Sequence, residues 1–219
     1  MIAPPTTLSF RVDGKRAMVS GISRGIGLAA AVTEAGAHVT CVARDERDLQ
    51  AVVNAAGMAR DGPPLETDEF DYRQVVEVNL CGAYLPSARA AKGMIEAGRP
   101  GWIIHVSSRM RHVGGVDRAV HGASRHGLEG LCKSMAIEWG PHDVRIDTIS
   151  PTSIRTPLTR ATFADPERVA RIRSTIKLPR LGEVADVMGA VVHLACDVSR
   201  LVTGTALLVD GGWTTGRAV

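Results

Sequence analysis

The sequence predicts an α/β protein of 219 residues with one doubly wound parallel sheet in a single domain. Three observations support this fold class. Short apolar runs alternate with longer helical segments, as in a parallel sheet whose crossovers are helices. The run at 102–107 carries apolar residues on both of its faces, which suits a strand that is covered on both sides. Only 4% of the residues are aromatic, so Ala, Val, Ile and Leu must build the core.

The first half of the chain opens as a βαβ unit. Residues 1–12 are expected to form a tail and 13–219 the domain. The apolar run at 15–20 predicts a buried strand, because it ends directly at a glycine. An Ala-rich helix is expected over 25–35, closed by Gly36 as its C-terminal cap. The elements expected next are strands at 38–43 and 51–54 and a long helical region at 68–97.

The second half continues the alternation after the strand at 102–107. The spacing of Leu128, Leu131 and Met135 predicts a helix over 122–139. A strand is expected at 144–149, followed by an excursion rich in Pro, Thr and Arg that shows no clear period. This excursion occupies 152–182. Helical spacing returns over 184–195, and a last strand is expected at 206–209.

Composition and charge exclude several classes of protein. The net charge is only +3, and basic residues alternate with acidic ones, which argues against a nucleic-acid-binding face. The four cysteines lie far apart without a CxxC pair, so we expect no metal site and reduced thiols in a cytoplasmic protein. Residues 1–7 lack the features of a signal peptide, and no apolar run reaches the length of a membrane span of about 18 residues.

The strongest local motif is a glycine-rich turn between the first strand and the first helix. A glycine at position 21 allows a tight turn, Gly25 allows backbone to approach a pyrophosphate, and Gly27 allows close packing of helix and strand. The helix N-terminus offers oriented N–H groups to phosphate. The alternative is a βα turn without a ligand. The predicted cofactor contacts of this turn are Gly21, Ser23, Arg24, Gly25, Ile26 and Gly27.

Six pieces of the sequence, in order, resemble the short-chain dehydrogenase/reductase family over most of the chain. The glycine turn is similar to the family's cofactor motif, with Ser20 where Thr is usual. The other pieces are Val53-Asn54-Ala55-Ala56-Gly57, Asn79, Val106-Ser107-Ser108, the stretch 144–151, and Leu181-Gly182-Glu183 with Val202-Thr203-Gly204 and Val209-Asp210-Gly211-Gly212. The resemblance implies a Rossmann-like fold, a small-molecule carbonyl or alcohol substrate, and a homodimer or homotetramer.

Charge near the adenosine end favours NADP(H) over NAD. Arg24 lies inside the glycine turn, Arg44 follows the second strand, and the acid that would favour NAD is absent because position 43 is Ala43. The alternative is that both arginines are simply solvated. The resemblance adds the cofactor contacts Asn54, Ala55, Ala56, Gly57, Pro151, Ile154 and Thr156.

The resemblance places a catalytic tetrad on Asn79, Ser108, His121 and Arg125. The family uses Tyr-x-x-x-Lys thirteen residues after the serine, and this chain has His121 and Arg125 there. Histidine is a legitimate general acid or base, but an imidazole is shorter than a phenol, and a displacement of about 1 Å can cost about a hundredfold. A neighbouring cation also lowers the pKa of histidine. We therefore expect weak or absent activity; alternatively, His121 is an exposed residue without a role. Asp147 departs from the usual Asn.

A second departure is missing chain. Only 33 positions separate Gly21 from Asn54, where the family has three strands and their helices. The link at 45–51 has seven residues, and a parallel crossover normally needs about a dozen or more. We therefore expect a sheet that lacks one edge strand and its flanking helices, is disturbed near 38–57, and binds the cofactor less well.

These observations predict an NADP(H)-dependent oxidoreductase in which Asn79 positions a water, Ser108 polarises the substrate oxygen, His121 exchanges a proton and Arg125 holds the ribose. The excursion at 152–182 would form a substrate lid, with Thr156 at the carboxamide of the cofactor. One alternative is a catalytically silent relative that binds nucleotide or assembles through helices near 70–97 and 119–139; another is an unstable truncated product.

Six arginines of the lid allow two interpretations. They either indicate an anionic substrate or belong to a solvated basic helix that has Asp165, Glu167 and Glu183 nearby. The six are Arg155, Arg160, Arg168, Arg171, Arg173 and Arg180.

Overall fold

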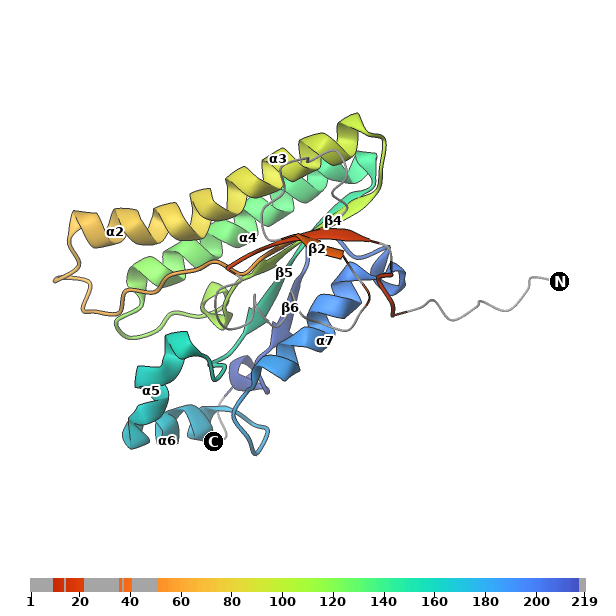
Figure 1. Cartoon of the computed structure of the whole chain (residues 1–219). Coiled ribbons are helices and arrows are strands. Elements are labelled where there is room, and N and C mark those ends of the chain that lie inside the picture. Colours follow the sequence, from red (N-terminus) through yellow and green to blue (C-terminus); the bar gives the residue numbers. More distant parts are fainter. Residues whose placement is uncertain (1–9, 14, 22–35, 37, 41–50, 217–219) are drawn as a thin grey trace.

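The structure is a computed structural model that describes residues 10–13, 15–21, 36, 38–40 and 51–216. The described residues form a six-stranded sheet in the order β2-β1-β3-β4-β5-β6, and every neighbouring pair is parallel. The predicted doubly wound α/β fold is therefore confirmed (Figure 1). The strands are β1 (Arg16–Ser20), β2 (His38–Thr40), β3 (Ala51–Asn54), β4 (Gly101–Val106), β5 (Val144–Pro151) and β6 (Ala206–Val209).

Helices cover both faces of this sheet. Figure 1 shows α2, α3 and α4 on one side, α7 on the other, and α5 and α6 beyond one end of the strands. The α-helices are α2 (Glu69–Val76), α3 (Gly82–Glu96), α4 (Ala119–Trp139), α5 (Arg160–Ala164), α6 (Pro166–Thr175) and α7 (Val184–Ala195). Short helical turns are η2 (Glu77–Cys81), η3 (Arg109–Arg111), η4 (Gly140–His142), η5 (Pro157–Thr159), η6 (Asp197–Ser199) and η7 (Trp213–Thr215).

The core has two halves because neighbouring residues of each strand point to opposite faces. Val53 and Ile104 pack with Val187, Val191 and Leu194 of α7. On the other face, a second cluster joins β3, β4 and β5 to α3 and α4; its members include Val52, Ile103, Ile146, Met94 and Cys132. The strands therefore carry apolar residues on both faces, as the sequence predicts for a parallel sheet.

The edge of the sheet differs in part from the expectation. β2 is the edge strand, and no strand of the described residues lies beyond it, which agrees with the predicted loss of one edge strand. The predicted disturbance near 38–57 is wrong for β3, because its four residues pair in regular parallel register with both β1 and β4. Ladder hydrogen bonds on both sides hold β3 in line whatever the length of the link that precedes it. Residues 41–50 of that link lie outside the described residues.

Most predicted elements are found close to their expected bounds. The predicted strands at 51–54 and 206–209 match β3 and β6 residue for residue, and α4 begins three residues before the predicted 122. The predicted helix at 25–35 and residues 41–43 of the second strand lie outside the described residues. The excursion at 152–182 contains helices that periodicity did not reveal. Its clearest local signal is Asp165-Pro166, because Asp165 accepts hydrogen bonds from the N–H groups of Glu167 and Arg168 at the start of α6.

The long helical region predicted at 68–97 is one rod with a wide turn inside it. The π-helical turn η2 joins α2 to α3, and Val75, Asn79, Ala83 and Ser87 are buried along the rod. Residues four apart drift around a regular α-helix by about 40° per step. The wide turn takes up this drift, so Asn79 stays on the buried face.

Candidate active site

A cavity of about 310 Å³ opens at the carboxyl ends of β3, β4 and β5. Side chains and backbone that follow these three strands form its floor, and the segment from Pro151 to Thr162 forms one wall. In a doubly wound sheet, ligands bind at this edge of the strands. The lining residues are Ala55, Gly57, Met58, Ala59, Asp61, Val106, Ser107, Ser108, Arg109, Met110, Arg118, His121, Arg125, Pro151, Thr152, Ser153, Ile154, Thr156, Pro157, Thr159 and Thr162.

The predicted site residues divide into three groups. Eight of them line the cavity: Ala55, Gly57, Ser108, His121, Arg125, Pro151, Ile154 and Thr156. Four lie behind it: Gly21, Asn54, Ala56 and Asn79. Six lie outside the described residues: Ser23, Arg24, Gly25, Ile26, Gly27 and Arg44.

Ser108 lies just after the carboxyl end of β4 and directly before the turn η3. Its extended backbone makes it the N-cap of that turn, and its Oγ accepts a hydrogen bond of 3.2 Å from the N–H of Met110. The cap occupies a lone pair of the hydroxyl and leaves its hydrogen available. Ser108 can therefore donate a hydrogen bond to an oxygen in the cavity.

His121 lies in the first turn of α4 with 8% of its surface exposed. Its Nδ1 is 3.3 Å from the carbonyl oxygen of Met58. Because a carbonyl only accepts, Nδ1 carries the hydrogen and Nε2 keeps its lone pair. Burial, with the charge of Arg125 acting in the same direction, lowers the pKa of His121 to about 4, and the contact with Met58 opposes this shift. His121 is therefore neutral at pH 7.

Arg125 follows His121 by one helical turn and is more deeply buried. Its Nη1 donates to the carbonyl oxygen of Val106 over 3.3 Å, and its buried Nε has no hydrogen-bond partner among the described residues. Burial lowers the pKa of Arg125 to about 10, and the carboxylate of Glu129 opposes this shift. Gly57 leaves room for the guanidinium, because a Cβ there would lie 2.5 Å from Nη2.

Asn79 supports the site from behind. Its amide nitrogen donates to the carbonyl oxygen of Met58 over 2.9 Å and to Oγ of Ser124 over 3.0 Å, while its oxygen accepts from the N–H of Met58 over 2.8 Å. These bonds clamp Met58, whose carbonyl in turn contacts His121. The side chain of Asn79 therefore positions the imidazole through the backbone of Met58.

Asn54 organises the end of β3. It accepts a hydrogen bond of 2.6 Å from Ser20 and donates one of 2.9 Å to the carbonyl oxygen of Gly82. The chain after β1 passes close by. Gly21 has φ +72°, and a Cβ there would lie 2.7 Å from the nitrogen of Ala56. Both its conformation and the close approach therefore require glycine at position 21.

The wall that follows β5 is held by local hydrogen bonds. Thr156 is the N-cap of η5, and its N–H donates to Oγ1 of Thr159 over 3.0 Å. Ile154 is buried and pairs with Gly182 in an isolated parallel bridge. These contacts present the backbone between β5 and α5 to the cavity.

The cavity residues that were not predicted include two arginines, Arg109 and Arg118. Arg109 directly follows Ser108, and Arg118 is the N-cap residue of α4, three positions before His121. Their closeness in sequence to predicted site residues is the signal that could have found them. Arg118 forms an ion pair with Asp61.

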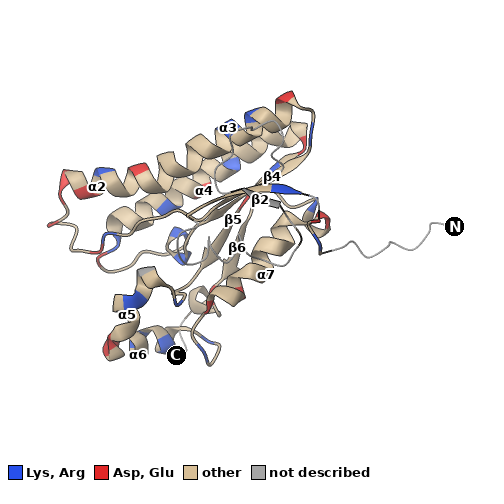
Figure 2. Cartoon of the chain, viewed as in Figure 1, with Lys and Arg blue, Asp and Glu red and all other residues tan. Residues whose placement is uncertain are grey.

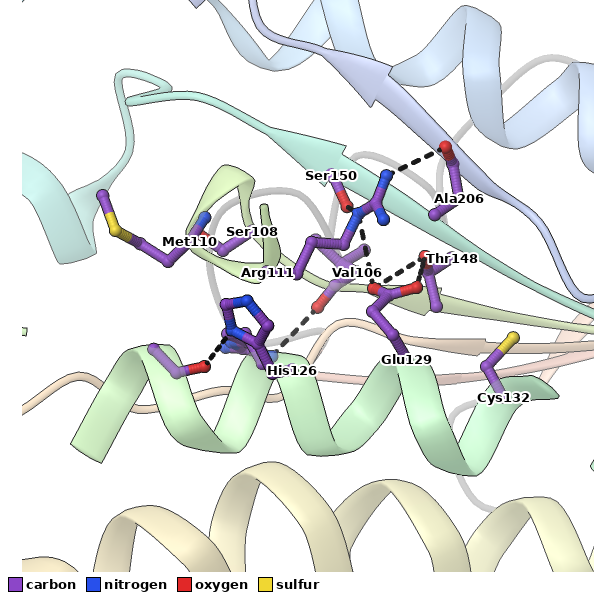
Figure 3. A network of polar contacts seen from close by, with 12 residues as sticks. Val106, Ser108, Met110, Arg111, His126, Glu129, Cys132, Thr148, Ser150 and Ala206 are labelled. Carbon is purple, nitrogen blue, oxygen red and sulfur yellow. Dashed lines mark hydrogen bonds and ion pairs between the residues drawn. The ribbon is translucent and has the colours of Figure 1, made fainter. Parts of the chain in front are cut away.

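A buried polar layer lies between α4 and the sheet (Figure 3). Arg111 donates to Oγ of Ser150 over 2.7 Å and to the carbonyl oxygen of Ala206 over 3.1 Å. Its Nε is 3.6 Å from the carboxylate of Glu129, which accepts from the hydroxyl of Thr148. This layer ties the helix that carries His121 and Arg125 to β5 and β6.

Asp147 is buried one strand position before this layer. Its carboxylate accepts a hydrogen bond of 3.1 Å from the N–H of Thr205 and lies 3.7 Å from Arg145. Burial raises the pKa of Asp147 to about 6, and both contacts oppose this shift. Asp147 does not line the cavity. The presence of Asp where the family usually has Asn therefore affects the sheet and not the site directly.

The six arginines of the segment 152–182 are exposed. None of them lines the cavity. Arg155 pairs with Glu183, Arg168 with Asp165 and Arg180 with Asp186, and Figure 2 shows basic and acidic segments next to one another on α5 and α6. The structure therefore favours the interpretation of a solvated basic surface.

No group of three or more His, Cys, Asp and Glu side chains in the described part of the chain could hold a metal ion. Cys81, Cys132 and Cys196 are free thiols, while Cys41 lies outside the described residues. No helix of the described part combines the length and the apolar character that a bilayer span requires.

Comparisons with known proteins agree on one family. A family model described as enoyl-(acyl carrier protein) reductase matches residues 42–214. D-erythrulose reductase of Gallus gallus is 33% identical, over 94% of this chain and 97% of the relative. L-xylulose reductase of Bos taurus is 31% identical, over 94% and 99%. The crystal structure of a gluconate 5-dehydrogenase from Burkholderia cenocepacia, in complex with NADP and tartrate, is 26% identical and covers 94% of this chain and 98% of that one, with a TM-score of 0.89.

The sheet order, the cavity at the carboxyl ends of the strands and these matches lead to one conclusion. The chain belongs to the short-chain dehydrogenase/reductase family.

Proposed function

We propose that this protein is an oxidoreductase that transfers a hydride between NADP(H) and a small carbonyl compound or secondary alcohol. One observation carries the proposal: Ser108, His121 and Arg125, which the sequence spacing relates to one another, line a single cavity. The named activities of the relatives support the substrate class, because D-erythrulose and L-xylulose reductases act on small polyhydroxy carbonyl compounds.

The described residues fit the nicotinamide end of a dinucleotide. The backbone at Ala55 and Gly57 faces the segment Pro151–Thr156 across the cavity, and the buried Nε of Arg125 is a donor without a partner. Arg125 would hold the ribose, and Thr156 the carboxamide. A bound nicotinamide would supply or accept the hydride. The charges of Arg24 and Arg44 support NADP over NAD, as does the NADP in the gluconate 5-dehydrogenase structure.

The residues of the chain would share the remaining work. The hydroxyl of Ser108 donates a hydrogen bond to the substrate oxygen and so stabilises negative charge that develops there. Nε2 of His121 takes the proton of an alcohol or, when protonated, gives one to a carbonyl oxygen. Asn79 keeps His121 in place through Met58.

We further propose that turnover is low compared with a Tyr–Lys site. A histidine with a pKa of about 4 is a weak base and is seldom protonated at pH 7. Because Nδ1 contacts Met58, the imidazole also reaches less far than a phenol would.

The test compares the parent protein with the double variant His121→Tyr/Arg125→Lys. Reduction of D-erythrulose and L-xylulose by NADPH is followed at 340 nm. We expect measurable reduction by the parent and a value of kcat/KM about a hundredfold higher in the double variant. Equal, robust turnover by both proteins would contradict the proposed impairment.

A second candidate function is nucleotide binding without catalysis, which the low pKa of His121 favours. Titration with NADPH, followed by its fluorescence, separates the two functions. Binding of NADPH without turnover of any carbonyl substrate would favour the silent relative. Absence of both would overturn both proposals.

A further inference from the structure

The charges that line the cavity are unbalanced. Three arginines and one aspartate face it, namely Arg109, Arg118, Arg125 and Asp61. The ion pair with Arg118 already uses Asp61. Arg125 has the carboxylate of Glu129 one helical turn away, which acts on its pKa. Arg109 forms no ion pair with any described carboxylate.

Arg109 is held in place without an ion pair, and the charge that acts on it, that of Asp210, belongs to a carboxylate that accepts hydrogen bonds from Gly212 and Thr214. Its guanidinium stacks over the ring of Trp213 at 4.3 Å, and Nη1 donates to the hydroxyl groups of Thr152 and Ser153, each over 3.3 Å. Its Nε is buried without a hydrogen-bond partner among the described residues. Burial lowers the pKa of Arg109 to about 10, a shift that the charge of Arg118 reinforces and that of Asp210 opposes. A buried guanidinium in this state is stabilised by any anion that enters the cavity.

Arg109 also lies close to the reacting groups. It is adjacent in sequence to Ser108, and its charge and that of Arg118 both act on the imidazole of His121. Because Ser108, Arg109 and His121 line the same cavity, a molecule whose oxygen sits between Ser108 and His121 can reach Arg109 with its other end. The cavity volume of about 310 Å³ is at the small end of the range for ligand pockets and would also hold the nicotinamide end of the cofactor, so that molecule is short.

We propose that Arg109 binds a carboxylate of the substrate, so that this protein prefers a small hydroxy or keto acid to a neutral sugar of the same carbon chain. The proposal rests on the proposed function for its reaction but not for its binding. A planar guanidinium fork matches a carboxylate, and such a charge-assisted pair contributes both affinity and orientation. The stack on Trp213 and the two hydroxyl contacts fix the plane of the fork in advance.

The experiment measures binding, so that it does not depend on turnover. D-gluconate and D-glucitol have the same carbon chain and differ in a carboxylate at one end. Calorimetric titration of the parent, with NADP present and absent, should show gluconate binding about tenfold more tightly or better than glucitol, as one charge-assisted contact provides. Fluorescence of Trp213 should report the same event and lose its response in Trp213→Phe.

Two variants separate Arg109 from general surface charge. Arg109→Gln should bring the two affinities to within about twofold of each other, and Arg155→Gln, a matched change on the lid surface, should leave the preference intact. Arg109→Lys keeps the charge without the planar fork and should retain part of the preference, which covers the case in which Arg109→Gln does not fold. D-glucose 6-phosphate serves as the arm for a phosphorylated substrate.

The outcomes are distinct. A preference for gluconate that disappears in Arg109→Gln supports the proposal even if no substrate is turned over, and only the proposed function would then fail. Equal affinities in the parent, absence of gluconate binding, a preference that survives in Arg109→Gln, or a stronger preference for D-glucose 6-phosphate would each overturn it.

Discussion

At the scale of single residues, the contact between His121 and Met58 sets the direction of proton transfer. The carbonyl of Met58 fixes the hydrogen on Nδ1, so Nε2 is the atom of the ring that can accept a proton or a hydrogen bond. At neutral pH this arrangement suits the removal of a proton from an alcohol. Donation to a carbonyl first requires protonation of an imidazole that burial and three arginines keep neutral.

The neutral state of His121 predicts different pH profiles for alcohol oxidation and carbonyl reduction. Because the pKa of His121 is about 4, alcohol oxidation should be independent of the protonation of His121 above about pH 5. Carbonyl reduction should fall about tenfold for each pH unit above 5, since the protonated fraction falls in that proportion. Initial rates with NADP and NADPH between pH 5 and 8 measure both profiles.

The variant His121→Tyr/Arg125→Lys is the control for these profiles. Its phenol titrates in another range, so the slope of the reduction profile between pH 5 and 8 should change. An unchanged slope would show that His121 is not the group that transfers the proton.

Sequence spacing predicted part of the site at this scale. Ser108 follows the end of β4 and His121 lies in the first turn of α4, and the two residues, which the sequence places thirteen positions apart, line one cavity. Arg109 and Arg118 were not predicted as site residues because arginine is usually a surface residue. Nothing in the sequence shows that the turn η3 folds Arg109 against Trp213. The six arginines of the segment 152–182, for which the sequence allowed an anionic substrate, lie on the surface.

At the scale of elements, the polar layer of Arg111 and Glu129 locks α4 to the sheet. Arg111 reaches from η3 to β5 and β6, and Glu129 reaches from α4 to β5 (Figure 3). The helix that carries His121 and Arg125 is thus fixed by a buried ion pair as well as by apolar packing. Such a pair contributes little net stability, because the cost of removing the two charges from water offsets their attraction.

Removal of one partner should therefore cost more than removal of both. Glu129→Ala leaves Arg111 buried without its carboxylate and should lower the free energy of unfolding by about 3–5 kcal/mol. The double variant Arg111→Met/Glu129→Leu should recover most of that loss. Urea unfolding followed by circular dichroism measures both, and an equal loss in the two variants would contradict this view of the layer.

Periodicity predicted the elements that carry an apolar pattern and missed those that lack one. The strands β3 and β6 and the helix α7 have clear apolar patterns, and their predicted bounds hold. The helix α6 has no buried residue, so it carries no apolar period that could be detected. Its start depends on the cap at Asp165, which is a local signal and not a periodic one.

At the scale of the whole molecule, three buried ionisable groups control stability in mild acid. Burial lowers the pKa of His105 and of His121 to about 4, and it raises that of Asp147 to about 6. Below the unfolded histidine pKa near 6.5, the unfolded chain takes up protons that the folded chain refuses, so stability falls down to about pH 4. Asp147 acts in the opposite sense, because its folded form binds a proton as pH falls through 6.

The two histidines outweigh the one aspartate, so the parent protein should lose stability between pH 6.5 and 4.5. His105→Asn removes one of the three groups and should flatten this loss, whereas His142→Asn, at an exposed position, should leave it unchanged. The midpoint of thermal unfolding at several pH values measures the effect. A midpoint that rises on acidification in the parent would contradict the prediction.

The overall architecture was the most predictable property of the chain. Alternation of strands and helices led to the parallel sheet, and the short link before β3 led to a sheet of fewer strands. The sequence could not reveal that β3 keeps a regular register, because that depends on ladder partners far along the chain. The assembly as a homodimer or homotetramer, the lid at 152–182 and the cytoplasmic location stay predictions.

The wide turn η2 has a consequence for insertions and deletions. A π-helical turn holds one residue more than an α-helical turn, so loss of one residue between Glu77 and Cys81 would restore a continuous α-helix. It would also rotate α2 against α3 by about 100°, which would turn Asn79 or Val75 out of the buried face. The rod is therefore sensitive to length and not only to residue type: a one-residue deletion at Val78 should release Met58 and with it the imidazole of His121.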